Sequence, residues 1–149
     1  MKIKTYSEQE TIETGKKFAQ LLKGKDVIVL EGELGGGKTT FTKGILQGLG
    51  SKQKVLSPSF TLMRQYKAKK FFIYHFDLYR IKRADALNLG IEDFLYSDKS
   101  ISLIEWGDRI KRDLDRCIKV EFSFLGQNIR SIKFSTKGYG NEKIKFISD

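Results

Sequence analysis

Apolar residues recur along the chain with two periods, and each period predicts a different kind of element. Behind the capping-box sequence "SEQE", small and apolar residues recur at helical spacing and predict a helix over residues 8–23. "VIVLE" (27–31) and "ISLIE" (101–105) are short continuous apolar runs, typical of strands buried on both faces of a sheet. Between them, "TTFTKGILQGLG" places three apolar side chains on one face of a second helix.

The rest of the chain is predicted to contain two regions of β structure, the second of which alternates, with short helices between them. Residues 55–76 read as strands, with a hairpin whose polar turn lies at 67–70. "RADALNLGIEDFL" predicts short helices around Gly90, and "GDRIKRDL" predicts one more. At the end, "IKVEFSFLG", "NIRSIKFS" and "KIKFIS" predict three strands, the first two joined by a turn at "GQN". We therefore expect one α/β domain over residues 1–149, with a mixed central sheet flanked by helices.

The composition favours one cellular compartment but does not identify the binding partners. No apolar run approaches a membrane span, and "MKIKTYSEQE" has no apolar signal segment. The single cysteine, Cys117, excludes an internal disulfide and favours a reducing compartment, so a cytoplasmic protein is expected. The net charge of +10 comes mostly from lysines spread along the chain. They form either a solvated surface or a patch for RNA or an acidic partner.

The segment "GELGGGKTT" carries the clearest chemistry. Gly32, Gly37, Lys38 and Thr39 match the phosphate-binding loop pattern G-x-x-x-x-G-K-[ST], between a predicted buried strand and a predicted helix. Glycines let successive backbone N–H groups turn toward phosphate oxygens, and the start of the helix directs its positive dipole end there. Lys38 is expected to reach the β- and γ-phosphates and the Thr39 hydroxyl to bind Mg²⁺, so the sequence predicts a nucleoside triphosphate site.

A phosphate loop needs an acidic partner for the magnesium ion, at the carboxyl end of a neighbouring strand. Glu105 ends the run "SLIE" and is the first candidate. Asp77 in "HFDLYR" is the second, with a surface aspartate as the alternative. His75 shares a strand face with Asp77 and is either part of the site or a packed core residue.

Three further residues are candidates for reporting the nucleotide state. Ser59 and Thr61 in "SPSFT" follow the second helix, where a switch segment would contact the γ-phosphate; a plain turn is the alternative. Trp106 directly follows Glu105 and either covers the site, docks a partner or packs in the ordinary way.

The stretches "GELGGGKTTFTKGILQGLG", "SPSFTL", "HFDLYR" and "LIEWGD", in this order and spacing, resemble the TsaE family (older name YjeE) over residues 7–136. The resemblance implies a small bacterial P-loop ATPase needed to make N6-threonylcarbamoyladenosine in tRNAs that read codons beginning with A. It also implies partners: the TsaB–TsaD pair, with tRNA reached through that complex and ATP use resetting it. Two positions depart from the family's usual residues, Gly36 for alanine and Ser59 for threonine.

The resemblance further implies roles for individual residues. ATP and Mg²⁺ are the implied ligands; Lys38, Asp77 and Glu105 would be catalytic, and Thr39 and Glu105 would hold the metal. Glu8 and Arg130, on weaker local matches, would lie beside the nucleotide. The complete set of implied nucleotide-binding residues is Glu8, Leu34, Gly35, Gly36, Gly37, Lys38, Thr39, Thr40 and Arg130.

Other readings of the loop remain open. A small-molecule P-loop kinase would share it, but no lid insertion with clustered arginines is evident. A GTPase is disfavoured because the sequence has no N-K-x-D segment. A binding module that holds ATP as a structural ligand would tolerate replacement of Glu105 and Asp77.

Overall fold

The computed structural model describes residues 1–33, 35–56 and 62–147 and contains one seven-stranded sheet with the strand order β1-β7-β6-β2-β5-β4-β3. The four central strands β6, β2, β5 and β4 run parallel, and antiparallel strands flank them on both sides. The strands are β1 (Lys2–Thr5), β2 (Val27–Glu31), β3 (Met63–Lys67), β4 (Phe72–Asp77), β5 (Ser100–Glu105), β6 (Cys117–Phe124) and β7 (Arg130–Lys137).

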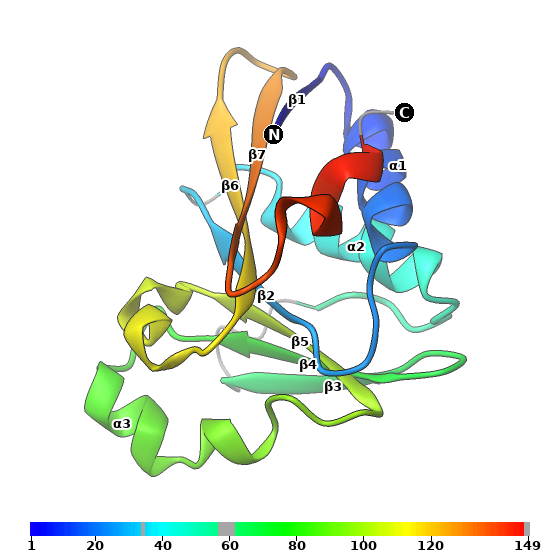
Figure 1. Ribbon diagram of the computed structural model, residues 1–149. Helices are drawn as coiled ribbons and strands as arrows, with labels where there is room; N and C mark the ends of the chain where they lie inside the picture. The colour runs from blue at the N-terminus through cyan, green and yellow to red at the C-terminus, as the bar shows by residue number, and fades with distance from the viewer. Residues whose placement is uncertain (34, 57–61, 148–149) are drawn as a thin grey trace.

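Helices cover both faces of this sheet (Figure 1). The α-helices are α1 (Glu8–Ala19), α2 (Lys38–Gly48) and α3 (Arg83–Asn88), and the 3₁₀ helices are η1 (Ile91–Asp93), η2 (Gly107–Arg109), η3 (Lys111–Asp113) and η4 (Asn141–Ile147). Helices α1 and α2 pack side by side on one face, while α3 lies on the other. The predicted fold class, an α/β domain with a mixed sheet flanked by helices, is confirmed.

Each face of the sheet has its own apolar core. On the α1–α2 face, Ile28 and Leu30 of β2 pack with Phe18 and Phe41 of the two helices. On the α3 face, Val29 of β2 packs in a second cluster with apolar side chains of β4, β5 and the short helices. The odd-numbered positions 73, 101 and 103 of β4 and β5 belong to the α1–α2 core. Strand alternation therefore directs His75, Asp77 and Glu105 toward α2 as well.

Helices α1 and α2 approach each other closely because glycines line their contact. An added Cβ on Gly44 would lie 2.2 Å from the carbonyl oxygen of Ile12, and the Cα atom of Gly15 would be only 3.0 Å away. This contact holds the start of α1 beside the start of α2. The N-terminus of α1 is capped as the sequence predicts, since Ser7 Oγ accepts the Glu10 N–H at 3.1 Å.

Several predicted boundaries differ from the structure. The first helix ends at Ala19 rather than residue 23, because the chain continues in tight turns that still bury Leu22. Residues 55 and 56, where β structure was predicted to start, are not in a strand, and the first strand of the hairpin begins at Met63. The hairpin itself, its turn at 67–70 and the short helices around Gly90 are confirmed. "GDRIKRDL" forms two 3₁₀ turns instead of one short helix.

The prediction for the C-terminal segment was wrong in one element. "KIKFIS" was expected to be a third strand, but residues 141–147 form η4. The sheet edge beside β7 is occupied by β1, a strand that the sequence analysis did not predict, and the tail packs elsewhere. Lys143 donates to the Asp26 carboxylate at 2.7 Å, and Tyr139 donates to the other oxygen of Asp26 at 2.7 Å. Among the described residues, no helix has the length and apolar character needed to cross a membrane.

Candidate functional site

Three parallel strands end at the same edge of the sheet, and each delivers one part of the site. Strand β2 leads directly into the glycine loop after Glu31. In the sheet register Leu30 of β2 lies opposite Glu105 of β5, and Glu105 lies opposite Asp77 of β4. The carboxyl ends of parallel strands are where ligands bind in open α/β sheets.

The glycine loop turns the chain from β2 into α2. Gly35 and Gly37 have left-handed backbone conformations, with φ values of 76° and 105°, which favour glycine over other residues. Gly37 is the N-cap of α2 and, being glycine, has no side chain of its own to cap this end. The first N–H groups of α2 are therefore directed to the loop, an arrangement suited to binding an anion.

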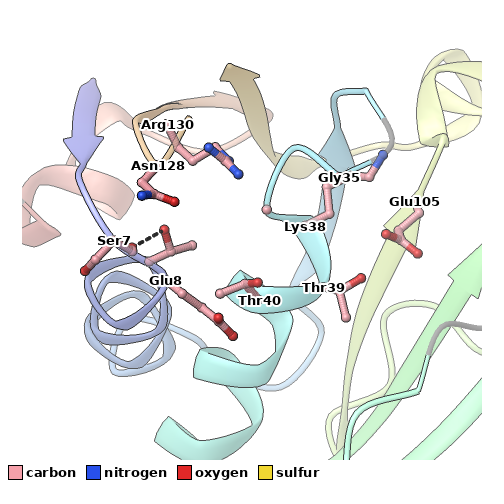
Figure 2. Close-up of a pocket in the computed structure, with 11 residues that line it drawn as sticks. Ser7, Glu8, Gly35, Lys38, Thr39, Thr40, Glu105, Asn128 and Arg130 are labelled. Carbon is pink, nitrogen blue, oxygen red and sulfur yellow. Dashed lines mark hydrogen bonds between the residues drawn. The ribbon is translucent and has the colours of Figure 1, made fainter. Parts of the chain in front are cut away.

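A pocket opens in front of the loop (Figure 2). Glu105 lies at one end of it, and Ser7, Glu8, Asn128 and Arg130 lie at the other. Lys38, Thr39 and Thr40 lie between these ends. The lining residues are Ser7, Glu8, Thr11, Gly35, Gly37, Lys38, Thr39, Thr40, Glu105, Asn128 and Arg130. Most of the predicted nucleotide-binding residues, taken from three separate parts of the sequence, thus face one space.

Lys38 is held at the loop by its own surroundings. The residue is 6% exposed, and its ammonium group donates a hydrogen bond to the Gly32 carbonyl. The same ammonium group lies 4.9 Å from the ring centroid of Trp106. Trp106 in turn packs against Tyr79, with ring centroids 4.9 Å apart, so the indole lies beside the loop. Trp106 is not among the pocket-lining residues, so its role in covering the site, docking a partner or packing in the ordinary way stays a prediction.

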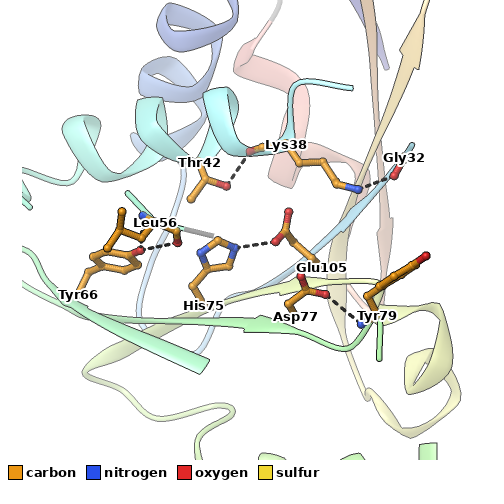
Figure 3. A network of polar contacts seen from close by, with 9 residues as sticks. All are labelled: Gly32, Lys38, Thr42, Leu56, Tyr66, His75, Asp77, Tyr79 and Glu105. Carbon is orange, nitrogen blue, oxygen red and sulfur yellow. Dashed lines mark hydrogen bonds and ion pairs between the residues drawn. The ribbon is translucent and has the colours of Figure 1, made fainter. Parts of the chain in front are cut away.

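The acidic residues lie side by side but have different contacts (Figure 3). Glu105 lines the pocket and is 5% exposed, with its Oε2 atom 3.3 Å from Nε2 of His75. Asp77 is 6% exposed and is not among the pocket-lining residues. Its Oδ1 atom accepts the N–H of Tyr79 at 2.9 Å, which fixes the turn that carries Tyr79 to Trp106.

Glu8 and Arg130 converge from opposite ends of the sequence. Glu8 is the first residue of α1, and Arg130 begins β7, opposite Thr5 of β1. The Arg130 side chain lies against the loop, because a Cβ on Gly37 would be 3.9 Å from its Cγ and Cδ atoms. Its guanidinium group stacks on Phe124, with Cζ 3.7 Å from the ring centroid. This stack, together with Nη1 contacts to backbone oxygens of the β6–β7 turn at 3.4 Å, holds the side chain where the residue lines the pocket.

Donor chemistry indicates how the pocket fits a magnesium triphosphate. The N–H groups at the start of α2, together with Lys38 and Arg130, are donors of the kind that phosphate oxygens accept. Within the described residues, no group of three or more His, Cys, Asp or Glu side chains is arranged to hold a metal ion alone. Thr39 and Glu105, which both line the pocket, offer two oxygen ligands. That number suits Mg²⁺, which usually combines one or two protein ligands with water and substrate phosphate.

The predicted site residues and the pocket-lining residues do not coincide completely. Leu34, Ser59 and Thr61 lie outside the described residues. Ser7, Thr11 and Asn128 line the pocket but were not predicted as site residues. The capping box gave a signal for Ser7 only as a helix start. Asn128, in the turn between β6 and β7, carries no recognisable pattern, and only the fold brings that turn to the pocket.

Comparison with known sequences identifies close similarity to one family. The family model described as "Threonylcarbamoyl adenosine biosynthesis protein TsaE" matches residues 5–132. The tRNA threonylcarbamoyladenosine biosynthesis protein TsaE of Rickettsia felis is 37% identical over 144 residues, which cover 95% of this chain and 83% of the relative. The protein of the same name from Bacillus subtilis is 34% identical over 139 residues, which cover 93% of this chain and 87% of the relative.

A solved structure agrees with the sequence comparison. The crystal structure of Bacillus subtilis YdiB superposes with a TM-score of 0.77 and 31% sequence identity, covering 99% of this chain and 91% of that chain. The family match runs from Thr5, the last residue of β1, through the glycine loop and both acidic strand ends to Ile132 in β7. The chain therefore belongs to the TsaE family of threonylcarbamoyladenosine biosynthesis proteins.

Proposed function

We propose that this protein is a Mg²⁺-dependent ATPase of the TsaE type that acts on the TsaB–TsaD complex during threonylcarbamoyladenosine modification of tRNA. One observation carries the proposal. The glycine loop, Glu105 of β5 and the Glu8–Arg130 pair face one pocket, although they are far apart in the sequence. Family membership supports the biosynthetic role, and a cytoplasmic location is part of the same proposal.

The residues divide the work along the pocket. The N–H groups of the loop and the Lys38 ammonium bind the β- and γ-phosphates, which requires the ammonium to leave the Gly32 carbonyl. Thr39 and Glu105 would hold the metal ion, directly or through water. When bound, Mg²⁺ neutralises charge that develops on the transferred phosphoryl group. Asp77, opposite Glu105 on the neighbouring strand, orients the attacking water or supports the metal. Arg130 and Glu8 position the remainder of the nucleotide.

Slow turnover by the isolated chain is part of this proposal. Efficient phosphoryl transfer usually needs an arginine finger near the γ-phosphate. Apart from Arg80, the sequence offers no evident arginine finger, and Arg130 lies at the end of the pocket away from Glu105. We therefore expect the TsaB–TsaD complex to stimulate hydrolysis, with Ser59 and Thr61 reporting the nucleotide state to the partners.

The proposal is tested by measuring phosphate release from ATP by the purified chain, first alone and then with TsaB, TsaD and tRNA. We expect a slow basal rate that rises strongly in the complex and disappears in Glu105→Gln. Glu92→Gln is a matched control, because Glu92 is an exposed carboxylate outside the pocket. Lys38→Ala should abolish nucleotide binding.

Three results would overturn the proposal. Full nucleotide binding by Lys38→Ala would remove the phosphate-loop assignment. Transfer of phosphate to an added metabolite, instead of its release, would indicate a kinase. If Glu105→Gln still supported tRNA modification, and ATP hydrolysis were absent both with and without the partners, the protein would be a module that uses ATP as a structural ligand.

A further inference from the structure

His75 is a buried imidazole that the proposed reaction does not use. It lies on β4, two residues before Asp77, and is 1% exposed. Its side chain lies between Tyr66 and Glu105 in Figure 3, with the Tyr66 and His75 ring centroids 6.4 Å apart. The Tyr66 hydroxyl is already engaged, because it contacts the backbone N and O atoms of Leu56 at 3.0 Å each.

The polar atoms of this imidazole are incompletely satisfied. Neither Nδ1 nor Nε2 has an aligned hydrogen-bond partner among the residues that the structure describes. Nε2 nevertheless lies 3.3 Å from Oε2 of Glu105, close enough for contact but not directed for a good hydrogen bond. Buried polar groups are normally hydrogen-bonded, so an unsatisfied one requires an explanation. Catalytic hydrogen bonds are often long or poorly aligned before the ligand binds.

Glu105 is in contact with both the imidazole and the pocket. Its Oε2 atom faces His75, while the residue itself lines the pocket beside Thr39. A carboxylate has two oxygens, so one can accept a hydrogen bond from the imidazole while the other binds a metal ion or its water. Such a bond would fix the rotation of the carboxylate and direct the free oxygen to the pocket.

We infer that His75 is a positioning residue that donates Nε2–H to Glu105 and orients this carboxylate toward the metal. The inference rests on the proposed function, because it requires Glu105 to act at the metal site. The neutral imidazole suffices, provided that the proton is on Nε2. Groups that orient metal ligands in this way commonly change metal affinity by about 10- to 100-fold when they are replaced.

The test measures by calorimetry how ADP binding depends on the Mg²⁺ concentration, with nucleotide in excess of the protein. The quantity compared between variants is the Mg²⁺ concentration at which the Mg²⁺-dependent part of ADP binding is half-saturated. His75→Asn and His75→Gln form a matched pair, since the glutamine amide nitrogen reaches the place of Nε2 and that of asparagine reaches only the place of Nδ1. We expect His75→Asn to raise the required Mg²⁺ concentration by about 10- to 100-fold. His75→Gln should stay near the wild-type value, and ADP binding in chelator should be unchanged in both.

Tyr66→Phe is the control for a general disturbance of this core layer, because it alters a neighbour of His75 that contacts Leu56 rather than Glu105. It should leave the Mg²⁺ requirement unchanged. An unchanged requirement in His75→Asn, or equal losses in the asparagine and glutamine variants, would overturn the inference. His75→Leu, which also lacks the donor, provides the same comparison if His75→Asn does not fold.

Glu105→Gln separates this inference from the proposed function. If that variant keeps the wild-type Mg²⁺ requirement, Glu105 is not at the metal site and the metal assignment fails together with the inference. If Glu105→Gln raises the requirement and His75→Asn does not, the metal assignment stands and the role of His75 is rejected.

Discussion

The ammonium group of Lys38 lies 4.9 Å from the ring centroid of Trp106, so the lysine of the glycine loop is in contact with the only tryptophan of the chain. The Trp106 backbone is left-handed, with a φ of 58°, immediately after Glu105 at the end of β5. This conformation turns the indole back beside the loop, where it packs on Tyr79. The phosphate loop and the acidic strand end are thereby linked through one aromatic side chain.

Tryptophan fluorescence should therefore report nucleotide binding. Phosphate that draws the Lys38 ammonium away from the indole changes the charge next to the ring. We expect a saturable change in emission when ADP is titrated, with a midpoint equal to the dissociation constant from calorimetry. Lys38→Met should show no change. Binding seen by calorimetry with constant emission would contradict the proposed movement of Lys38.

Replacement of Arg130 should weaken nucleotide binding without unfolding the protein. Its guanidinium lines the pocket and stacks on Phe124, and a charge-assisted hydrogen bond contributes about 1.5–3 kcal/mol. Arg130→Ala should therefore lower ADP affinity by about 10- to 100-fold. Lys133→Ala removes an exposed cation from the same strand and should leave the affinity unchanged. Equal affinities for both variants would exclude Arg130 from the nucleotide site.

A methyl group between α1 and α2 should destabilise the fold. In Gly44→Ala the new Cβ would lie 2.2 Å from the Ile12 carbonyl oxygen, so the helices must separate. Overpacking of this kind costs about 1–3 kcal/mol, measurable by urea unfolding. Gly126→Ala is the control, because its Cβ would meet Ile129 at an ordinary 3.5 Å. A Gly44→Ala variant as stable as the control would show that this contact is not tight.

The Tyr139–Asp26 contact predicts how stability depends on alkaline pH. Burial and the hydrogen bond to Asp26 raise the pKa of the Tyr139 phenol well above its ordinary value. The folded state therefore keeps this proton when the unfolded state begins to lose it near pH ~10. The resulting stabilisation is complete below that pH and is lost as the pH rises toward the higher pKa of the folded state.

Comparison of Tyr139→Phe with the wild type isolates this effect. At neutral pH the variant should be less stable by about 1–2 kcal/mol, because the Asp26 carboxylate loses one donor but keeps Lys143. The difference in the free energy of unfolding between the two proteins should become smaller above pH ~10, where the phenol of the unfolded wild type ionises. Tyr6→Phe, at an exposed tyrosine, should follow the wild type throughout. A difference that stays constant with pH would contradict the raised pKa.

Local patterns were sufficient for the elements that carry the phosphate loop. The run "VIVLE" and the helical spacing after Lys38 predicted β2 and α2, because a strand buried on both faces and an amphipathic helix have distinct periods. Glu105 and Asp77 were found in the same way, as carboxylates at the ends of short strands. The glycine pattern was recognised without tertiary information, because its spacing is visible in the sequence itself.

Only the tertiary structure decided which other residues lie at the site with the glycine loop and its acidic residues. Lys2–Thr5 becomes a strand because it pairs with β7 and occupies that sheet edge, and residues 143–147 lie in η4 instead of a third strand. Asn128 and Arg130 reach the pocket through the β6–β7 hairpin, and Glu8 reaches it through the close glycine contact of α1 with α2. Edge pairing and helix packing depend on contacts between distant segments. The hydrophobic periodicity along the chain does not predict such contacts. The sequence by itself therefore determined the chemistry of the loop and its acids, whereas the folded sheet decided which side chains complete the site.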